Sequence, residues 1–132
     1  DMYEEFYLPY LAEVGNLFGH TYYGCCETVD DRIDRIAKAM PNLRTVSVSG
    51  WNNFEKVGEI LGNNYVYSRK PTPAHISGSY PNWDLAEEDI RSTLNAAKNG
   101  SLEFIVRDVY EVNGDISRLS KWVEMTKRVL QI

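Results

Sequence analysis

The densest group of chemically reactive side chains in the 132-residue sequence is Cys25-Cys26-Glu27. Thiolates and carboxylates are ligands of Zn²⁺, and a catalytic zinc site keeps one position open for water or substrate. Neighbouring side chains of a strand point to opposite faces, so a regular strand would direct only one sulfur inward. His20, His75 or another chain would then have to supply a further ligand. The alternative is that both cysteines are small buried thiols with a packing role.

Two cationic groups stand where strands are expected to end. Arg69-Lys70 precedes Pro71, and Arg107 is followed by Asp108. Cations that face a cleft bind carboxylate or phosphate groups. The alternatives are a solvated loop edge for the first group and an internal salt bridge for the second. If the apolar residues that alternate before Arg107 face the helices, Arg107 points inward, and a shift of one residue would bring in Asp108 instead.

Aromatic and histidine side chains complete the candidate site. Tyr23 and Trp51 lie near expected strand ends, where a ring can stack on a flat ligand, although most aromatic residues near strands belong to the core. His75 lies in a long proline-rich loop, where a ligand-binding or acid–base role competes with simple solvation. His20 is expected at the opposite end of its strand. The sequence contains no glycine-rich phosphate loop, serine elbow or HExxH motif.

The elements that must position these residues alternate between strand and helix. Hydrophobic periodicity predicts helices over residues 2–18, 28–40, 54–61, 84–99 and 115–130, and β-rich runs predict strands over residues 20–25, 43–49, 65–70 and 102–108. Pro9 should kink or restart the first helix. Thr28 with Asp31, and Asp84 with Glu87, have the spacing of capping boxes.

This order, a helix followed by about four strand–helix units, predicts an α/β fold with a parallel sheet and right-handed crossovers. The valines of the strand 43–49 should lie under the helices, and the small polar residues between them should face a barrel interior or cleft. A full eight-unit barrel takes roughly 250 residues, so this chain would form a partial TIM-type (β/α) barrel. Ligands of such sheets bind beyond the carboxyl ends of the strands, where the candidate residues stand.

Composition argues against several classes of partner. The chain carries 14 Lys and Arg against 19 Asp and Glu, a formal net charge of -5, and it has no basic stripe for nucleic acid or an anionic membrane surface. Adjacent cysteines rarely form a disulfide with each other, which fits a reducing cytoplasm. There is no signal peptide and no apolar run of about 18 residues. The helical pattern is already under way at Asp1, so we expect a further segment upstream.

Several strings of this sequence resemble a bacterial branch of the uroporphyrinogen decarboxylase-like superfamily. They are Tyr23-Gly24-Cys25-Cys26-Glu27, Asn42-Leu43-Arg44 with Ser47-Val48-Ser49, Ser68-Arg69-Lys70-Pro71 with Pro73-Ala74, and Met2-Tyr3-Glu4-Glu5-Phe6 with Leu8-Pro9-Tyr10-Leu11. The resemblance covers essentially the whole chain. It implies an eight-stranded (β/α) barrel in which residues 1–132 are the C-terminal half, strands five to eight.

That superfamily includes a porphyrinogen decarboxylase and zinc-dependent methyltransferases that move methyl groups between corrinoid proteins and thiols. The decarboxylase keeps its catalytic aspartate and substrate arginines largely in the other half of the barrel. The methyltransferases hold zinc through a His-x-Cys at the end of strand five and a later cysteine. Here Tyr23 and Gly24 stand two places before Cys25 and Cys26, and no later cysteine exists, so Glu27 would have to replace a missing ligand.

The resemblance therefore implies a relative of the corrinoid- and zinc-type methyltransferases, with Cys25, Cys26 and Glu27 as catalytic residues and metal ligands. The groups that would bind a small molecule or the corrinoid of a partner protein are Tyr23, Trp51, Arg69, Lys70, His75, Arg107 and Asp108. The alternatives are a metal-independent decarboxylase of a tetrapyrrole-like acid and a non-catalytic corrinoid- or ligand-binding module. An isolated half is expected to be inactive. Its open strand edges favour self-association or pairing with the missing N-terminal half.

Overall fold

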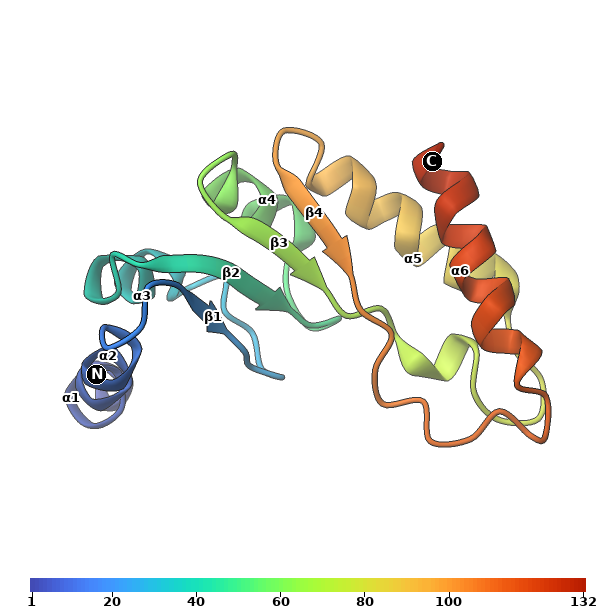
Figure 1. The fold of residues 1–132 in the computed structure, drawn as a ribbon, viewed down its shortest axis with the longest axis horizontal. Helices are drawn as coiled ribbons and strands as arrows, with labels where there is room; N and C mark the ends of the chain where they lie inside the picture. Colours follow the sequence, from blue (N-terminus) through green and yellow to red (C-terminus); the bar gives the residue numbers. More distant parts are fainter.

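A computed structural model describes residues 1–132 and shows an α/β fold built on one four-stranded sheet (Figure 1). The strands are β1 (Thr21–Tyr23), β2 (Leu43–Val48), β3 (Val66–Arg69) and β4 (Ser101–Phe104). They pair in chain order, and every pair is parallel. The expected all-parallel sheet with intervening helices is therefore confirmed.

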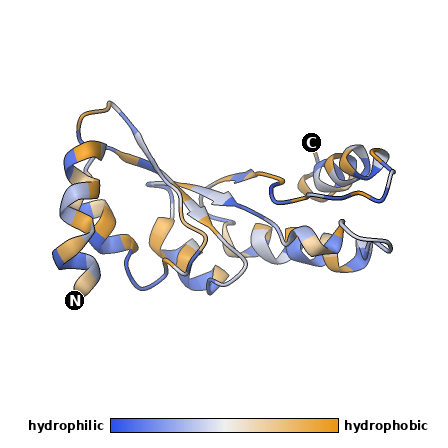
Figure 2. Cartoon of the chain, turned by 90° about the horizontal axis from the view of Figure 1, so that it is seen from below, coloured by the Kyte–Doolittle hydropathy of each residue, from blue (hydrophilic) through white to orange (hydrophobic).

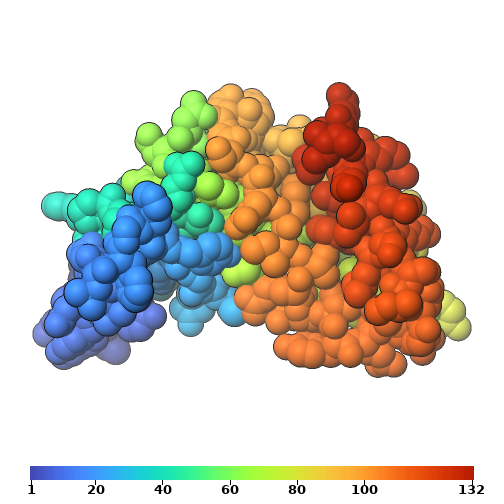
Figure 3. Space-filling model, in the orientation of Figure 1, coloured from blue at the N-terminus to red at the C-terminus, as the bar shows by residue number.

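The helices cover one face of this sheet and flank its two ends. They are α1 (Met2–Phe6), α2 (Leu8–Gly15), α3 (Ile33–Ala39), α4 (Phe54–Leu61), α5 (Trp83–Ala96) and α6 (Ser117–Leu130), with a short 3-10 helix, η1, at Pro73–His75. α1 and α2 lie beyond β1, and α6 lies at the opposite end of the molecule (Figures 1 and 3). Right-handed crossovers between strands paired in chain order place their helices on the same side. Figure 2 shows no helix above the middle of the sheet, so its other face is left uncovered.

Side chains alternate between the two faces as the sequence predicts. Val46 and Val48 of β2 are fully buried in the core under the helices. Ser47, between them, pairs in register with Ser68 of β3. The Ser68 hydroxyl is hydrogen-bonded at 2.9 Å to the Tyr22 hydroxyl of β1. These polar side chains lie on the face that no helix covers, although Ser47 and Ser68 are themselves fully buried beneath neighbouring side chains.

The apolar core has two parts. The sheet and the helices α2, α3 and α4 bury the larger cluster. A smaller cluster around α5 and α6 consists of Ile76, Ala86, Ile90, Trp122, Met125 and Val129. α4 meets α5 at Gly58, where an added Cβ would lie 2.0 Å from the carbonyl oxygen of Ala96, so only glycine permits this approach. Leu85 of α5 and Val123 of α6 are each 44% exposed, because the residues of the smaller cluster form the inward stripe.

Helix boundaries follow the expected breaks but not the expected caps. The helix predicted over residues 2–18 is divided at Tyr7 and restarts with Pro9 in its first turn, where the missing N–H of proline costs nothing. Neither predicted capping box forms. α3 begins after Arg32, which provides no side-chain cap, and the Asp31 carboxylate bonds to the Arg32 guanidinium at 3.1 Å instead. α5 is capped by Asn82, whose side chain accepts a backbone N–H at 3.1 Å.

The last strand is shorter than expected. The sequence predicts a strand over residues 102–108, but β4 ends at Phe104. The Ile105 N–H still donates to the Arg69 carbonyl at 3.0 Å, after which the chain leaves the sheet. Asp108 has a left-handed backbone with φ of 56°. The segment that follows β4 therefore turns across the carboxyl end of the sheet as a loop and carries Arg107 and Asp108 with it.

The long loop after β3 is clamped to α6. The buried Arg118 guanidinium donates to the carbonyl oxygens of Ile76, Gly78 and Ser79 at 3.4, 2.5 and 3.3 Å. Hydrogen bonds from a charged donor are stronger than neutral ones. This part of the loop is thus held by the last helix rather than left free over the sheet edge.

The amino-terminal helices present a broad apolar surface to solvent. The side chains that are each more than half exposed there are Met2, Phe6, Tyr7, Tyr10, Val14, Leu17 and Phe18. Figure 2 shows extensive hydrophobic segments on the same helices, beside the N label. Contiguous apolar patches of this kind mark interaction surfaces. No helix of the chain combines the length and apolar character that crossing a bilayer requires.

Candidate functional site

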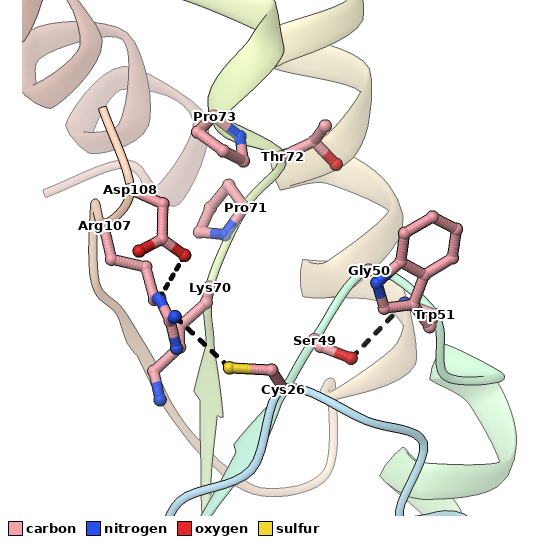
Figure 4. A pocket seen from close by; sticks show the side chains of 10 residues that line it. All are labelled: Cys26, Ser49, Gly50, Trp51, Lys70, Pro71, Thr72, Pro73, Arg107 and Asp108. Carbon is pink, nitrogen blue, oxygen red and sulfur yellow. Dashed lines mark hydrogen bonds and ion pairs between the residues drawn. The ribbon is translucent and has the colours of Figure 1, made fainter. Parts of the chain in front are cut away.

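The carboxyl ends of the strands meet at a cavity of about 320 Å³ (Figure 4). Its lining residues are Cys26, Ser49, Gly50, Trp51, Lys70, Pro71, Thr72, Pro73, Arg107 and Asp108. They follow all four strands in turn, so parallel pairing brings distant segments of the chain to one rim. Among the residues proposed from the sequence, this rim brings together Cys26, Trp51, Lys70, Arg107 and Asp108.

The two adjacent cysteines lie in different environments. Cys26 is exposed at the cavity, and its sulfur accepts a hydrogen bond from Arg107 Nη2 at 3.3 Å. Cys25 is half-buried against the core under the sheet, and its sulfur accepts the backbone N–H of Glu27 at 3.3 Å. Only one of the pair therefore faces the site, as alternation along an extended segment requires.

Arg107 is held between a carboxylate and a thiol. Its Nε donates to Asp108 Oδ2 at 2.6 Å while its Nη2 reaches Cys26. The Asp108 carboxylate, and after it the Cys26 sulfur, raise the pKa of the Arg107 guanidinium above its ordinary value. The left-handed backbone at Asp108 turns the carboxylate back toward its neighbour. Both side chains therefore line the cavity, whereas the sequence predicted that only one of the two would point inward.

Lys70 brings a positive charge to the cavity without an acidic partner. Its ammonium donates to Ser47 Oγ at 2.5 Å and lies 5.3 Å from the centre of the Tyr22 ring. Both contacts are with uncharged groups, and no carboxylate of the chain forms an ion pair with Lys70. This half-buried cation therefore has no ion-pair partner within the protein.

Arg69 points away from the cavity, in contrast to the expectation that it would face the cleft beside Lys70. Its side chain is 1% exposed and lies under the helices, where Nη2 donates to Asp89 Oδ1 at 2.6 Å and Nε donates to Thr93 Oγ1 at 3.3 Å. The guanidinium also stacks 4.4 Å from the centre of the Phe54 ring. Arg69 and Lys70 are neighbours at a strand end, so they face opposite sides of the sheet.

Three further proposed residues lie outside the cavity lining. Tyr23 is buried in the core, where burial raises the pKa of its hydroxyl, which accepts a hydrogen bond from the Tyr3 hydroxyl at 3.3 Å. Glu27 is exposed and lies 3.8 Å from Arg32. His75 is half-buried in η1. None of the three side chains lines the cavity.

Some cavity residues were not proposed from the sequence. Ser49 lines the rim and accepts the backbone N–H of Trp51 at 3.4 Å, and Ser47 anchors the Lys70 ammonium. The alternation of valine and serine in β2 was the signal that places both hydroxyls on the uncovered face. Thr72 and Pro73 also line the cavity, but no pattern in the sequence distinguishes them from the rest of the loop.

The cysteine and glutamate side chains do not fit a zinc centre. No group of three or more His, Cys, Asp and Glu side chains is arranged to hold a metal ion. Cys25 and Cys26 are directed apart, and Glu27 faces Arg32. The Arg107 guanidinium occupies the place beside the Cys26 sulfur where a metal ion would bind.

Comparisons of the chain with protein-family models, with curated proteins and with solved structures find no match. The resemblance to the uroporphyrinogen decarboxylase-like superfamily thus rests on the sequence strings alone.

The first prediction concerns the contribution of the buried ion pair between Arg69 and Asp89 to stability. Asp89→Leu should lower the free energy of unfolding by about 3–5 kcal/mol, because it leaves the Arg69 charge buried without its partner. The double variant Arg69→Met with Asp89→Leu should be more stable than Asp89→Leu alone, since it removes both charges. Urea denaturation followed by circular dichroism measures both.

The exposed pair of Arg91 with Glu87 provides the control for this experiment. Arg91→Ala should leave the midpoint of denaturation almost unchanged, because exposed ion pairs contribute little. If Asp89→Leu were as mild as Arg91→Ala, the buried pair would not anchor the strand end as described.

Proposed function

We propose that this chain is the C-terminal half of a (β/α) barrel enzyme related to the uroporphyrinogen decarboxylase-like superfamily, and that its rim cavity binds the carboxylates of a small-molecule substrate. The strand order and the absence of a helix over the middle of the other face support the barrel, since sheets with helices on both faces interrupt the chain order of their strands. The polar uncovered face supports an interior that holds a ligand. The cavity lies at the strand ends where such barrels bind substrates.

The observation that carries this proposal is the positive charge of the rim. Lys70 and Arg107 bring two cations to the cavity, and Asp108 supplies one carboxylate against them. Half-buried cations without internal partners attract anions, and a guanidinium with free N–H groups suits the planar carboxylate. The hydroxyl of Ser49, which lines the cavity, adds a neutral hydrogen-bonding group beside them.

Among the expected reactions, the metal-independent decarboxylation of a carboxylate-rich, tetrapyrrole-like acid fits this rim best. Lys70 and Arg107 would bind acidic side chains of the substrate and fix its orientation, while the other half of the barrel would supply the reacting group. Methyl transfer is the second candidate, favoured by the exposed Cys26 sulfur in the same cavity. A non-catalytic ligand-binding module would show binding without turnover.

The role of Lys70 predicts a loss of carboxylate binding on substitution. Lys70→Gln should weaken the binding of succinate, measured by isothermal titration calorimetry, by about 10- to 100-fold, the worth of one hydrogen bond to a charged group. Lys56→Gln removes an exposed cation of α4 and serves as the matched control. Equal affinities for the two variants would remove Lys70 from the binding site.

The open surfaces predict association. β1 and β4 are free strand edges, and the apolar side chains of α1 and α2 are exposed beside β1, so the chain should self-associate or pair with the half that completes the barrel. Light scattering should therefore report a mass above the 15.2 kDa of one chain.

A pair of variants distinguishes this association from nonspecific aggregation. Phe6→Glu with Tyr10→Glu, which charges the apolar surface, should shift the chain toward a monomer. Tyr80→Glu, at an exposed position in the loop after β3, should not. A well-folded wild-type monomer at all concentrations would contradict the prediction.

A further inference from the structure

We infer that Cys26 acts as a metal-free nucleophile toward alkylating agents that carry a carboxylate. This inference rests on the proposed function, because it uses the carboxylate-binding cations of the same cavity. It adds a covalent step and a substrate class, namely anionic alkyl donors. It starts from the observation that Cys25, Cys26 and Glu27 are not arranged to hold a metal ion.

The position of the sulfur is the first support. Cys26 is exposed and lines the cavity at the carboxyl end of the sheet. Its contact is with the Arg107 guanidinium at 3.3 Å, which is in turn fixed by Asp108 at 2.6 Å. Figure 4 shows Arg107 between the carboxylate and the sulfur. The three groups thus form a chain in which the carboxylate orients the guanidinium and the guanidinium orients the thiol.

The positive charge of Lys70, which has no ion-pair partner, independently supports the preference for anionic reagents. Its ammonium lines the same cavity but contacts Ser47 and Tyr22, not Cys26 or Asp108. An anionic reagent drawn to this ammonium and to Arg107 would be held in the cavity into which the sulfur opens. A neutral reagent of the same size would lack that attraction.

Cys25 provides a comparison within the same chain. It differs from Cys26 by one position, but its sulfur is half-buried against the core and takes a hydrogen bond from the Glu27 backbone. No cation of the cavity contacts it. Only Cys26 should therefore discriminate between anionic and neutral reagents.

The step is a nucleophilic displacement that balances without an oxidant or a metal. The Cys26 thiol loses its proton to solvent, and the sulfur electron pair attacks the sp³ carbon next to the carboxylate. The sulfur–carbon bond forms as the bond from that carbon to the leaving group breaks. The leaving group departs with the electron pair of that bond, and the product is a carboxyalkyl thioether on Cys26.

The test compares iodoacetate with iodoacetamide, which differ in charge and are similar in size. The ratio of their alkylation rates at Cys26 is measured by mass spectrometry in a Cys25→Ser background, with the urea-unfolded chain as reference. The folded chain should favour iodoacetate by about tenfold relative to the unfolded chain, the scale of electrostatic steering in a charged cleft. Lys70→Gln should abolish most of this preference, measured as the ratio of the two rates, and Lys70→Arg should retain it.

The controls keep this inference separable from the proposed function. Lys56→Gln should leave the preference intact, and a Cys26→Ser chain that retains Cys25 should show none. A folded ratio equal to the unfolded ratio would overturn the nucleophile, even if succinate still binds and the proposed carboxylate site stands. Failure of succinate to bind would instead overturn the proposed function. Circular dichroism confirms that each variant is folded before it is compared.

Discussion

The buried ion pair between Arg69 and Asp89 fixes the geometry on which the site depends. Arg69 ends β3, and its guanidinium is held under the helices by Asp89 and by the ring of Phe54. Because consecutive residues of a strand face opposite sides, Lys70 is then directed to the uncovered face. The same Asp89 carboxylate accepts the Thr72 N–H at 2.9 Å, so one acid of α5 fixes both the end of the strand and the start of the rim loop.

The same alternation separates structural from chemical roles along the rim. On the helix-covered side, Arg69 needs an internal partner because a buried charge without one is costly. On the uncovered side, Lys70 contacts only neutral groups and remains available to an external anion. Cys25 and Cys26 divide in the same way, one against the core and one at the cavity. A sheet with helices on one face thus yields one face for stability and one for a ligand.

Much of the fold could be predicted from the sequence because each strand is a short β-rich run followed by an amphipathic helix. The faces of Val46 and Ser47 followed from their alternation alone. The direction of Arg69 could not be predicted, because its partner Asp89 is 20 positions away on a helix whose rotation is set by packing. The sequence could establish that only one cysteine faces inward, but choosing Cys26 required the position of the segment after β1 relative to β2.

The reactive groups were harder to predict than the elements. A strand over residues 102–108 would have placed Arg107 and Asp108 on opposite faces. The chain leaves the sheet after Phe104, and the left-handed backbone at Asp108 brings both side chains to the cavity. Loop conformation of this kind depends on local hydrogen bonds and backbone torsion, and residue alternation does not report it.

If Lys70 and Arg107 form one carboxylate-binding rim, a single ligand should contact both. Nuclear magnetic resonance of the ¹⁵N-labelled side chains of lysine and arginine during titration with succinate tests this. The Lys70 Nζ and Arg107 Nε resonances should shift together with one saturation curve, while the Arg69 Nε resonance, buried under the helices, should stay in place. Shifts at Arg69 with Lys70 unchanged, or separate curves for Lys70 and Arg107, would contradict a shared rim.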